Sequence, residues 1–249
     1  MLDAAQLGRE GIDGTDEHGH GRVRKFGVVG APDDPSVPAW IFRTQANNRP
    51  VGGAPRCEAG FARRADALPR GTVFWHAFSI WLDGWSAARD ETAITQWYHG
   101  VPGVGLNPPL VIVARGPRLW ALVRHAEDER PATRGDTRVD TVFDVELPDL
   151  HGRWLDFVIR ARTWPDATQP SFVEVYLDGR RLGRYEGPVG YAFDGAGELP
   201  RHGLYPLVNG PRTFDASVPV RRMYLRRSLV LSDRRGALSV EDVLRRLRP

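Results

Sequence analysis

Cysteine and lysine are almost absent from this 249-residue chain, which holds only Cys57 and Lys25. A single cysteine excludes an intramolecular disulfide and any metal site that needs several thiolates. Arginine therefore supplies 33 of the 34 basic residues (34 − 1). A GC-rich coding genome produces that bias without a functional cause. The formal net charge of +3 is only mildly basic, so charge alone does not indicate a nucleic-acid partner.

Long apolar runs are also lacking. No stretch approaches the ~18 apolar residues that a membrane-spanning helix needs, so we expect no membrane association. The first residues include an acid and lead into no apolar segment, so we expect no signal peptide in this sequence. Residues 1–25 are rich in glycine, histidine and charge, with little to bury, and predict a flexible N-terminal arm.

Short alternating or aromatic-rich segments separated by turn residues fill the rest of the chain, and they predict β-strands. The turn at Asp178-Gly179 between two such segments predicts a hairpin. The expected strands cover residues 26–29, 40–43, 56–61, 73–81, 93–99, 110–114, 119–125, 141–147, 154–161, 172–177, 181–185 and 220–231. Residues 186–200 are expected to form a glycine-rich loop.

One helix is expected, at the C-terminal end. Ser239 is a typical N-cap residue and Asp242 follows three positions later, which predicts a helix over residues 240–247. About a dozen strands and one short helix indicate an all-β fold, a β-jelly roll or concanavalin-like two-sheet sandwich. Without an internal repeat or a clear linker, residues 26–249 are predicted to form a single domain.

Residues 201–205 carry the most suggestive strand face. Alternation places Arg201, Gly203 and Tyr205 on one side of a strand, with His202 and Leu204 on the other. The first side combines a permanent cation and a phenol. The bare glycine between them would let a ligand approach closely.

Two more strand faces have the same polar character. Arg56 and Glu58 share one face of their strand, with Cys57 behind. Gln96 and Tyr98 share a face of another strand. We expect these three faces to line one groove.

Four short motifs occur in the order found in jelly-roll polysaccharide lyases. They are R-C-E at 56–58, Q-W-Y-H-G at 96–100, G-R-W-L-D-F at 152–157 and R-H-G-L-Y at 201–205. Across residues 40–230 the chain resembles the glucuronan lyase and heparin lyase I-like group, and alginate lyases of the same fold more distantly. The resemblance implies β-elimination on a glycan that contains uronic acid.

The resemblance also implies roles for particular residues. Tyr205 would be the catalytic base, the acid, or both. Gln96 and Arg56 would neutralise the uronate carboxylate, and Arg201, which stands where the family usually has lysine, would bind substrate. Charge-assisted hydrogen bonds from such donors stabilise the developing enolate, and a positioned phenol moves protons.

One position departs from the family pattern. Related lyases often carry histidine two residues after the glutamine, where this chain has Tyr98, followed by His99. Either Tyr98 replaces the histidine, or His99 does its work through a β-bulge, or catalysis is impaired.

Further substrate contacts are expected from Glu58, Trp75 and His76. Other interpretations stay open: His76 as a hydrogen-bonded core residue, Trp75 as core, and Arg56 and Glu58 as a salt bridge that closes a sheet face. Tyr205 itself is a core tyrosine in the alternative interpretation.

Two other classes of protein share this architecture. The first is a non-catalytic laminin-G or concanavalin-like glycan-binding module, with the hairpin around Asp178-Gly179 as a generic feature. The second is a glycoside hydrolase with Glu58 and Asp156 as a carboxylate pair.

The expected partner is an acidic polysaccharide, bound by a monomer without nucleic acid or membrane. No cofactor and no metal site are expected, and a structural calcium ion is left open. A polymeric glycan substrate implies an extracellular or virion-associated protein, although the sequence shows no export route.

Overall fold

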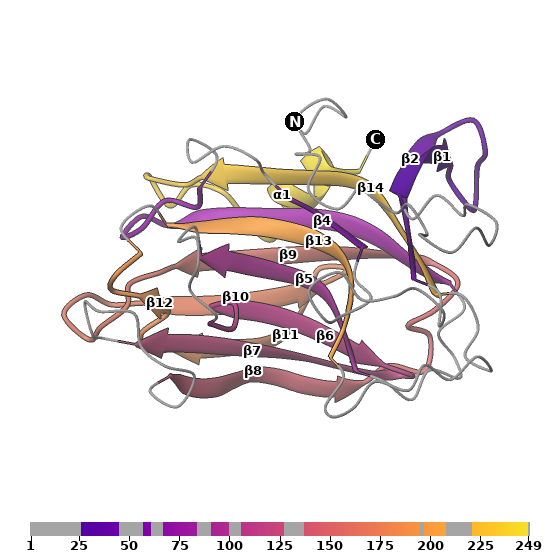
Figure 1. Cartoon of the computed structure of the whole chain (residues 1–249). Helices are drawn as coiled ribbons and strands as arrows, with labels where there is room; N and C mark the ends of the chain where they lie inside the picture. The colour runs from indigo at the N-terminus through magenta and orange to yellow at the C-terminus, as the bar shows by residue number, and fades with distance from the viewer. Residues whose placement is uncertain are drawn as a thin grey trace.

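A computed structural model describes residues 26–44, 57–60, 67–83, 91–99, 106–126, 137–194, 197–207 and 221–248. The expected N-terminal arm, residues 1–25, lies outside the described residues. Two β-sheets pack face to face (Figure 1). All strand pairs among the described residues are antiparallel except one short parallel pair. The prediction of an all-β jelly roll with a short C-terminal helix is confirmed.

The first sheet is named here the β4 sheet. Its strands in spatial order are β1 (Phe26–Gly30), β2 (Pro38–Thr44), β14 (Arg221–Ser232), β4 (Phe74–Asp83), β9 (Trp154–Arg162), β10 (Phe172–Leu177) and β11 (Arg180–Glu186). The second is named the β13 sheet. Its strands are β12 (Gly190–Tyr191), β7 (Arg118–Ala126), β6 (Leu110–Arg115), β5 (Thr92–His99), β13 (Glu198–Pro206) and β3 (Cys57–Gly60), while β8 (Arg138–Glu146) also pairs with β7.

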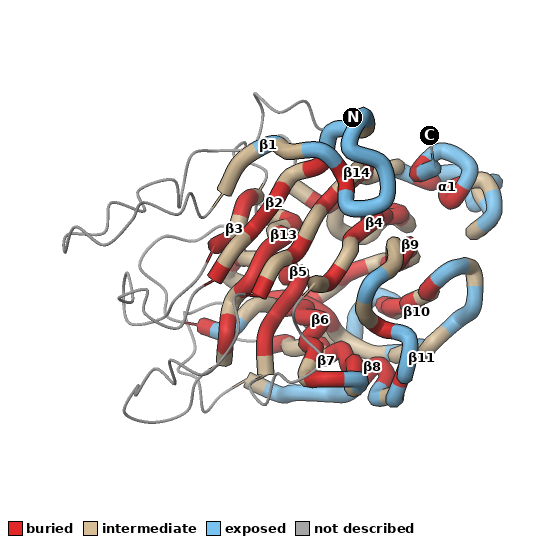
Figure 2. The backbone as a smooth tube through the Cα atoms, turned by 90° about the vertical axis from the view of Figure 1, so that its right-hand side faces the viewer, coloured by how far each residue is buried: buried red, intermediate tan, exposed pale blue. Residues whose placement is uncertain are grey.

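The core lies between the sheets and follows the alternation in the sequence. On β4, Phe74, Phe78, Ile80 and Leu82 face the other sheet and are completely buried. Apolar side chains on β5, β6, β9 and β13 complete this layer, and Figure 2 colours much of these strands as buried. Burying apolar area from both inner faces at once is what fixes the register of the strands.

The helix α1 (Val240–Leu247) covers the outer face of the β4 sheet. Its buried residues, Val243, Leu244 and Leu247, pack on β4, β9 and β14, away from β13 (Figure 2). The side chain of Ser239 accepts a hydrogen bond from the Asp242 backbone, and Asp242 caps the Ser239 backbone in return. The predicted cap and helix bounds are therefore confirmed.

Residues 186–200 are not a continuous loop as the glycine-rich composition predicts. They contain β12 and the start of β13. Tyr191 decides this, because its buried ring packs with Leu106 and Ala126 while its strand pairs in parallel with β7. Among the described residues, no helix is long and apolar enough to span a bilayer.

Candidate active site

The outer face of the β13 sheet brings together the polar residues that the sequence singled out on β3, β5 and β13. β13 lies between the other two strands, with Arg201 opposite Gln96 on one side and Gly203 opposite Glu58 on the other. Directly paired residues of antiparallel strands project to the same face. Segments more than a hundred residues apart in sequence therefore present one continuous polar surface.

Gln96 and Glu58 form a short hydrogen bond on this surface. The Gln96 Nε2 donates a hydrogen bond of 2.6 Å to Glu58 Oε1. Because a carboxylate only accepts, the nitrogen of the Gln96 amide must face Glu58. With 4% of its surface exposed, Gln96 is held in one orientation by this bond.

Arg201 lies next to this pair and covers Tyr98. The Arg201 Cζ is 4.0 Å from the centroid of the Tyr98 ring, which is a close cation–π contact. Tyr98 is opposite Leu199 and Arg201 is opposite Gln96, so all three polar side chains share the outer face. The guanidinium is thus oriented by an aromatic ring.

Tyr205 occupies the same face four residues beyond Arg201. It packs against an apolar cluster on the outer surface of β5, β6 and β7, formed by Ala93, Val111, Val113 and Trp120. Sequence reasoning did not predict this outer-face apolar cluster. Its signal is the alternation of Trp120 with Leu119 and Ala121, which are buried in the inter-sheet core.

His99 does not share the face of Gln96. It is completely buried, its Nε2 lies 3.3 Å from the Leu106 carbonyl oxygen, and its ring meets Tyr191 edge-on. The pairing of β5 with β13 is regular between Gln96 and His99, so the β-bulge needed to turn His99 outward is absent from this described segment. Tyr98 occupies the outward position.

Gly203 was predicted to let a ligand approach the strand closely, but the structure gives a different reason for glycine at this position. It has a positive φ of 147°, and a Cβ there would lie 2.1 Å from the Cys57 carbonyl oxygen and 2.6 Å from the Glu58 Cα. The missing side chain therefore lets β3 pair closely with β13. Open space for a ligand is not what requires glycine here.

Replacing Gly203 with alanine is expected to lower the free energy of unfolding by about 2–3 kcal/mol, because the clash with β3 and the positive φ both add strain. Urea unfolding measures the change. Gly27→Ala is the matched control, since a Cβ at Gly27 meets nothing within 4 Å. Equal stability of the two variants would contradict the close approach of β3.

Two residues predicted to contact substrate are interior instead. Trp75 is 2% exposed under α1, on the outer face of the opposite sheet, and its Nε1 donates to Asp233 Oδ2 at 3.0 Å. His76 is completely buried between the sheets. The prediction of substrate contacts is wrong for both: α1 covers the face of Trp75, and alternation directs His76 into the core.

His76 begins a chain of buried hydrogen bonds that ends at the candidate site. The indole Nε1 of Trp97 donates to His76 Nδ1 at 3.1 Å, so a neutral His76 carries its proton on Nε2. That nitrogen lies 3.4 Å from His202 Nε2. The proton of a neutral His202 is therefore on Nδ1, which faces Thr95 Oγ1 at 3.0 Å.

Thr95 completes the chain by donating to the Arg201 carbonyl oxygen at 2.8 Å. A further link joins His202 Nε2 to Ser228 Oγ on β14 at 2.9 Å. Burial lowers the pKa of His202 to about 3, and burial together with His202 holds the pKa of His76 well below its usual value. Both rings are therefore neutral, and they tie the strand that carries Arg201 to the opposite sheet.

Neither Arg56 nor Asp156, the remaining predicted residues, can be placed on this surface. Arg56 lies outside the described residues. Asp156, the proposed partner of Glu58 in a hydrolase, is on the outer face of the β4 sheet, where it accepts from Ser79 at 2.7 Å and Arg248 at 2.8 Å. The two carboxylates therefore lie on different sheets and form no hydrolytic pair. Within the described ranges, no three His, Cys, Asp or Glu residues cluster to hold a metal ion.

The fold and this surface define a two-sheet jelly-roll protein with arginine, amide and phenol groups on one outer face. A family model described as polysaccharide lyase matches residues 27–224. The chain belongs to the polysaccharide lyase family and is an enzyme that acts on polysaccharides.

Solved structures show the same fold. An endo-β-1,4-glucuronan lyase from the fungus Trichoderma reesei is 16% identical, with a TM-score of 0.65 over 86% of this chain and 91% of that one. An alginate lyase of polysaccharide lyase family 7 is 13% identical, with a TM-score of 0.55 over 85% and 84%.

The fold also occurs in a protein of another kind. The binding domain of botulinum neurotoxin serotype C1 is 11% identical, with a TM-score of 0.56 over 89% of this chain and 45% of that one. No curated protein sequence matches the chain significantly.

Proposed function

We propose that this lyase cleaves a glucuronan- or heparin-like polymer of uronic acid by β-elimination on the outer face of the β13 sheet. The observation that carries the proposal is the arrangement of Gln96, Glu58 and Arg201 on one face, with Tyr205 further along it. The fold likeness to a glucuronan lyase supports glucuronan as the first polymer to test. Such a substrate places the enzyme outside a cell or on a virion.

The first task of the site is to bind the uronate carboxylate at carbon 6. The guanidinium of Arg201 is proposed to supply a planar set of donors, and the Gln96 amide is proposed to supply another. Arg56 is proposed to contribute to the same task. Neutralising this carboxylate makes the C5 proton more acidic and stabilises the enolate that forms when it leaves.

The second task is proton transfer. A base removes the C5 proton, the C5–H electron pair forms a C4=C5 double bond, the C4–O bond breaks, and the departing glycosidic oxygen takes a proton. Tyr205 is proposed as the base, the acid or both. Tyr98 is proposed for the task that histidine performs in related lyases, because it projects beside Arg201 while His99 is buried.

Ultraviolet absorbance tests this function, because elimination creates a conjugated unsaturated uronate and hydrolysis does not. The wild-type enzyme is mixed with glucuronan, heparin or heparan sulfate, alginate and hyaluronan. We expect the absorbance to rise with glucuronan. If the absorbance rises with alginate alone, alginate rather than glucuronan is the substrate. If these polymers slow the migration of the protein in a gel but no absorbance rise occurs, the glycan-binding module is favoured.

A further inference from the structure

A second arginine-rich surface lies on the opposite side of the sandwich. It surrounds an open hollow of about 500 Å³ on the outer face of β9, β10 and β11. The β13 sheet is separated from it by the whole core. The function proposed above uses none of its residues.

Cross-strand pairing places the side chains of this surface in two rows. Phe172 on β10 lies between Arg162 on β9 and Glu186 on β11. In the next row, Glu174 lies between Arg160 and Arg184. Side chains in such rows are direct neighbours on the face of a sheet.

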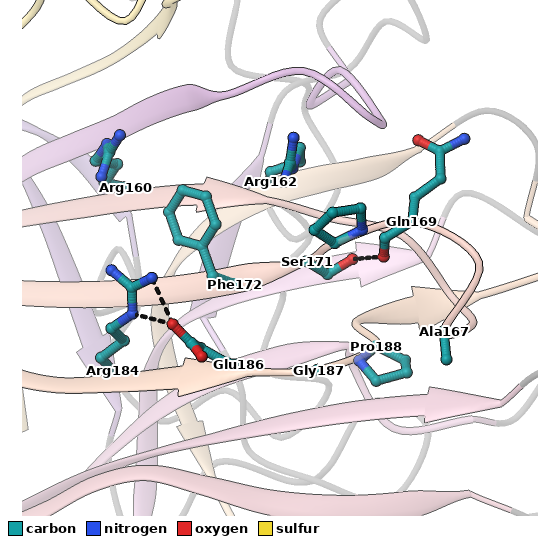
Figure 3. A pocket seen from close by; sticks show the side chains of 11 residues that line it. Arg160, Arg162, Ala167, Gln169, Ser171, Phe172, Arg184, Glu186, Gly187 and Pro188 are labelled. Atoms are coloured by element: carbon teal, nitrogen blue, oxygen red, sulfur yellow. Dashed lines mark hydrogen bonds and ion pairs between the residues drawn. The ribbon is translucent and has the colours of Figure 1, made fainter.

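Two guanidinium groups contact the ring of Phe172. The Cζ atoms of Arg160 and Arg184 are 5.1 Å and 5.3 Å from its centroid. Phe172 lies among Arg160, Arg162 and Arg184 (Figure 3). Phe172 is only partly buried, so the part of its ring that the guanidinium groups leave uncovered offers a sugar an apolar surface, while these groups offer an anion a positive field.

The charges of this surface do not cancel. Glu174 is 3% exposed and pairs with Arg160 at 3.1 Å and with Arg184. Glu186 also pairs with Arg184. Because both carboxylates are already paired with arginine, their negative charges are partly neutralised. They therefore repel a bound anion only weakly.

Among the described arginines that line the hollow, Arg162 is the one that forms no ion pair, whereas Arg160 and Arg184 pair with Glu174. Arg162 also has a buried Nε without a hydrogen-bond partner among the described residues. A buried donor of this kind gains most when an acceptor reaches it. Its planar guanidinium matches a carboxylate with two parallel hydrogen bonds.

We propose that this hollow is a second, non-catalytic binding site for a uronate residue of the acidic polysaccharide, with Arg162 holding the carboxylate and Phe172 packing against the sugar ring. The ligand class rests on the proposed function. Two sites on opposite faces raise the affinity for long chains, because a second contact on the same polymer is intramolecular. A short oligosaccharide reaches only one face.

Affinity electrophoresis in gels that contain glucuronan tests this site. The full chain carries Tyr205→Phe to prevent cutting, and Arg162→Glu is added. We expect Arg162→Glu to weaken retention at least fivefold. Arg138→Glu is the control of equal charge, because Arg138 is exposed on β8 at the edge of the other sheet. Arg162→Gln repeats the test without introducing a negative charge. Gels with a neutral glucan should retain none of the proteins.

A kinetic measurement separates the two sites. With a glucuronan tetrasaccharide, kcat/KM should be the same for wild type and Arg162→Glu. Equal retention of the Arg162→Glu and Arg138→Glu variants would overturn the second site. The second site would also be overturned if Arg162→Glu lost tetrasaccharide cleavage by the same factor as it lost polymer retention. Failure of the proposed function shows separately, as no absorbance rise with wild type on any uronate polymer.

Discussion

Tyr205→Phe is expected to lower the rate of β-elimination by about 10²–10⁴-fold, the usual contribution of a positioned proton-transfer group. Phenylalanine keeps the ring that packs on Ala93, Val113 and Trp120, so the fold should be unchanged. Only the hydroxyl that moves the proton is lost. The rate of absorbance increase on the preferred polymer measures the effect, with thermal unfolding as the check on stability.

Two other tyrosines make the result specific. Tyr98→Phe keeps the ring beneath Arg201 and removes the other phenol on the same face. Tyr224→Phe removes a hydroxyl on β14 of the opposite sheet and should leave the rate within twofold. A Tyr205→Phe enzyme at full rate, with Tyr98→Phe inactive, would transfer the proton-moving role to Tyr98.

The second large effect is a loss of stability in mild acid. Burial lowers the pKa of His202 to about 3, against about 6.5 for an exposed histidine. Between these values the unfolded chain binds a proton that the folded chain does not. The free energy of unfolding therefore falls as pH falls below 6.5, by about 2 kcal/mol for this group between pH 7.5 and 5.

His76 adds to this loss, because its pKa is also lowered. The buried Glu198 acts in the opposite direction, because burial raises its pKa and protonation then favours the folded state. Other carboxylates whose pKa is lowered, such as Asp233, matter mainly below pH 5. Between pH 7.5 and 5 the two histidines therefore lower the stability while Glu198 opposes them, so a His202 variant is needed to isolate the contribution of His202.

Urea unfolding across this range measures the slope for wild type and for His202→Asn. Asparagine retains an amide donor for Thr95 but loses the ring contacts with His76 and Ser228, so the variant should be less stable at pH 7.5. Because asparagine does not titrate, the variant should lose less stability on acidification. A variant that loses as much stability as wild type between pH 7.5 and 5 would show that His202 takes up no proton on unfolding there.

The alternation of side chains in the sequence was enough for the architecture and for part of the site. It predicted that Arg201 and Tyr205, Gln96 and Tyr98, and Arg56 and Glu58 share strand faces, and in the structure Arg201, Gln96, Tyr98 and Glu58 do lie on one face of the β13 sheet. The Ser239 and Asp242 cap predicted α1 with its bounds. These features are local, because a period of two or a cap depends on residues a few positions apart.

Tertiary structure alone decided what covers each face. Alternation placed Trp75 outward on β4, but α1, which follows some 165 residues later, buries it. Gly203 is bare because β3 approaches β13, a pairing between strands that lie far apart in the chain. The neutral pair of His76 and His202 likewise forms only when the two sheets meet. Periodicity fixes which residues share a side, whereas only chain packing over long distances fixes what they meet there.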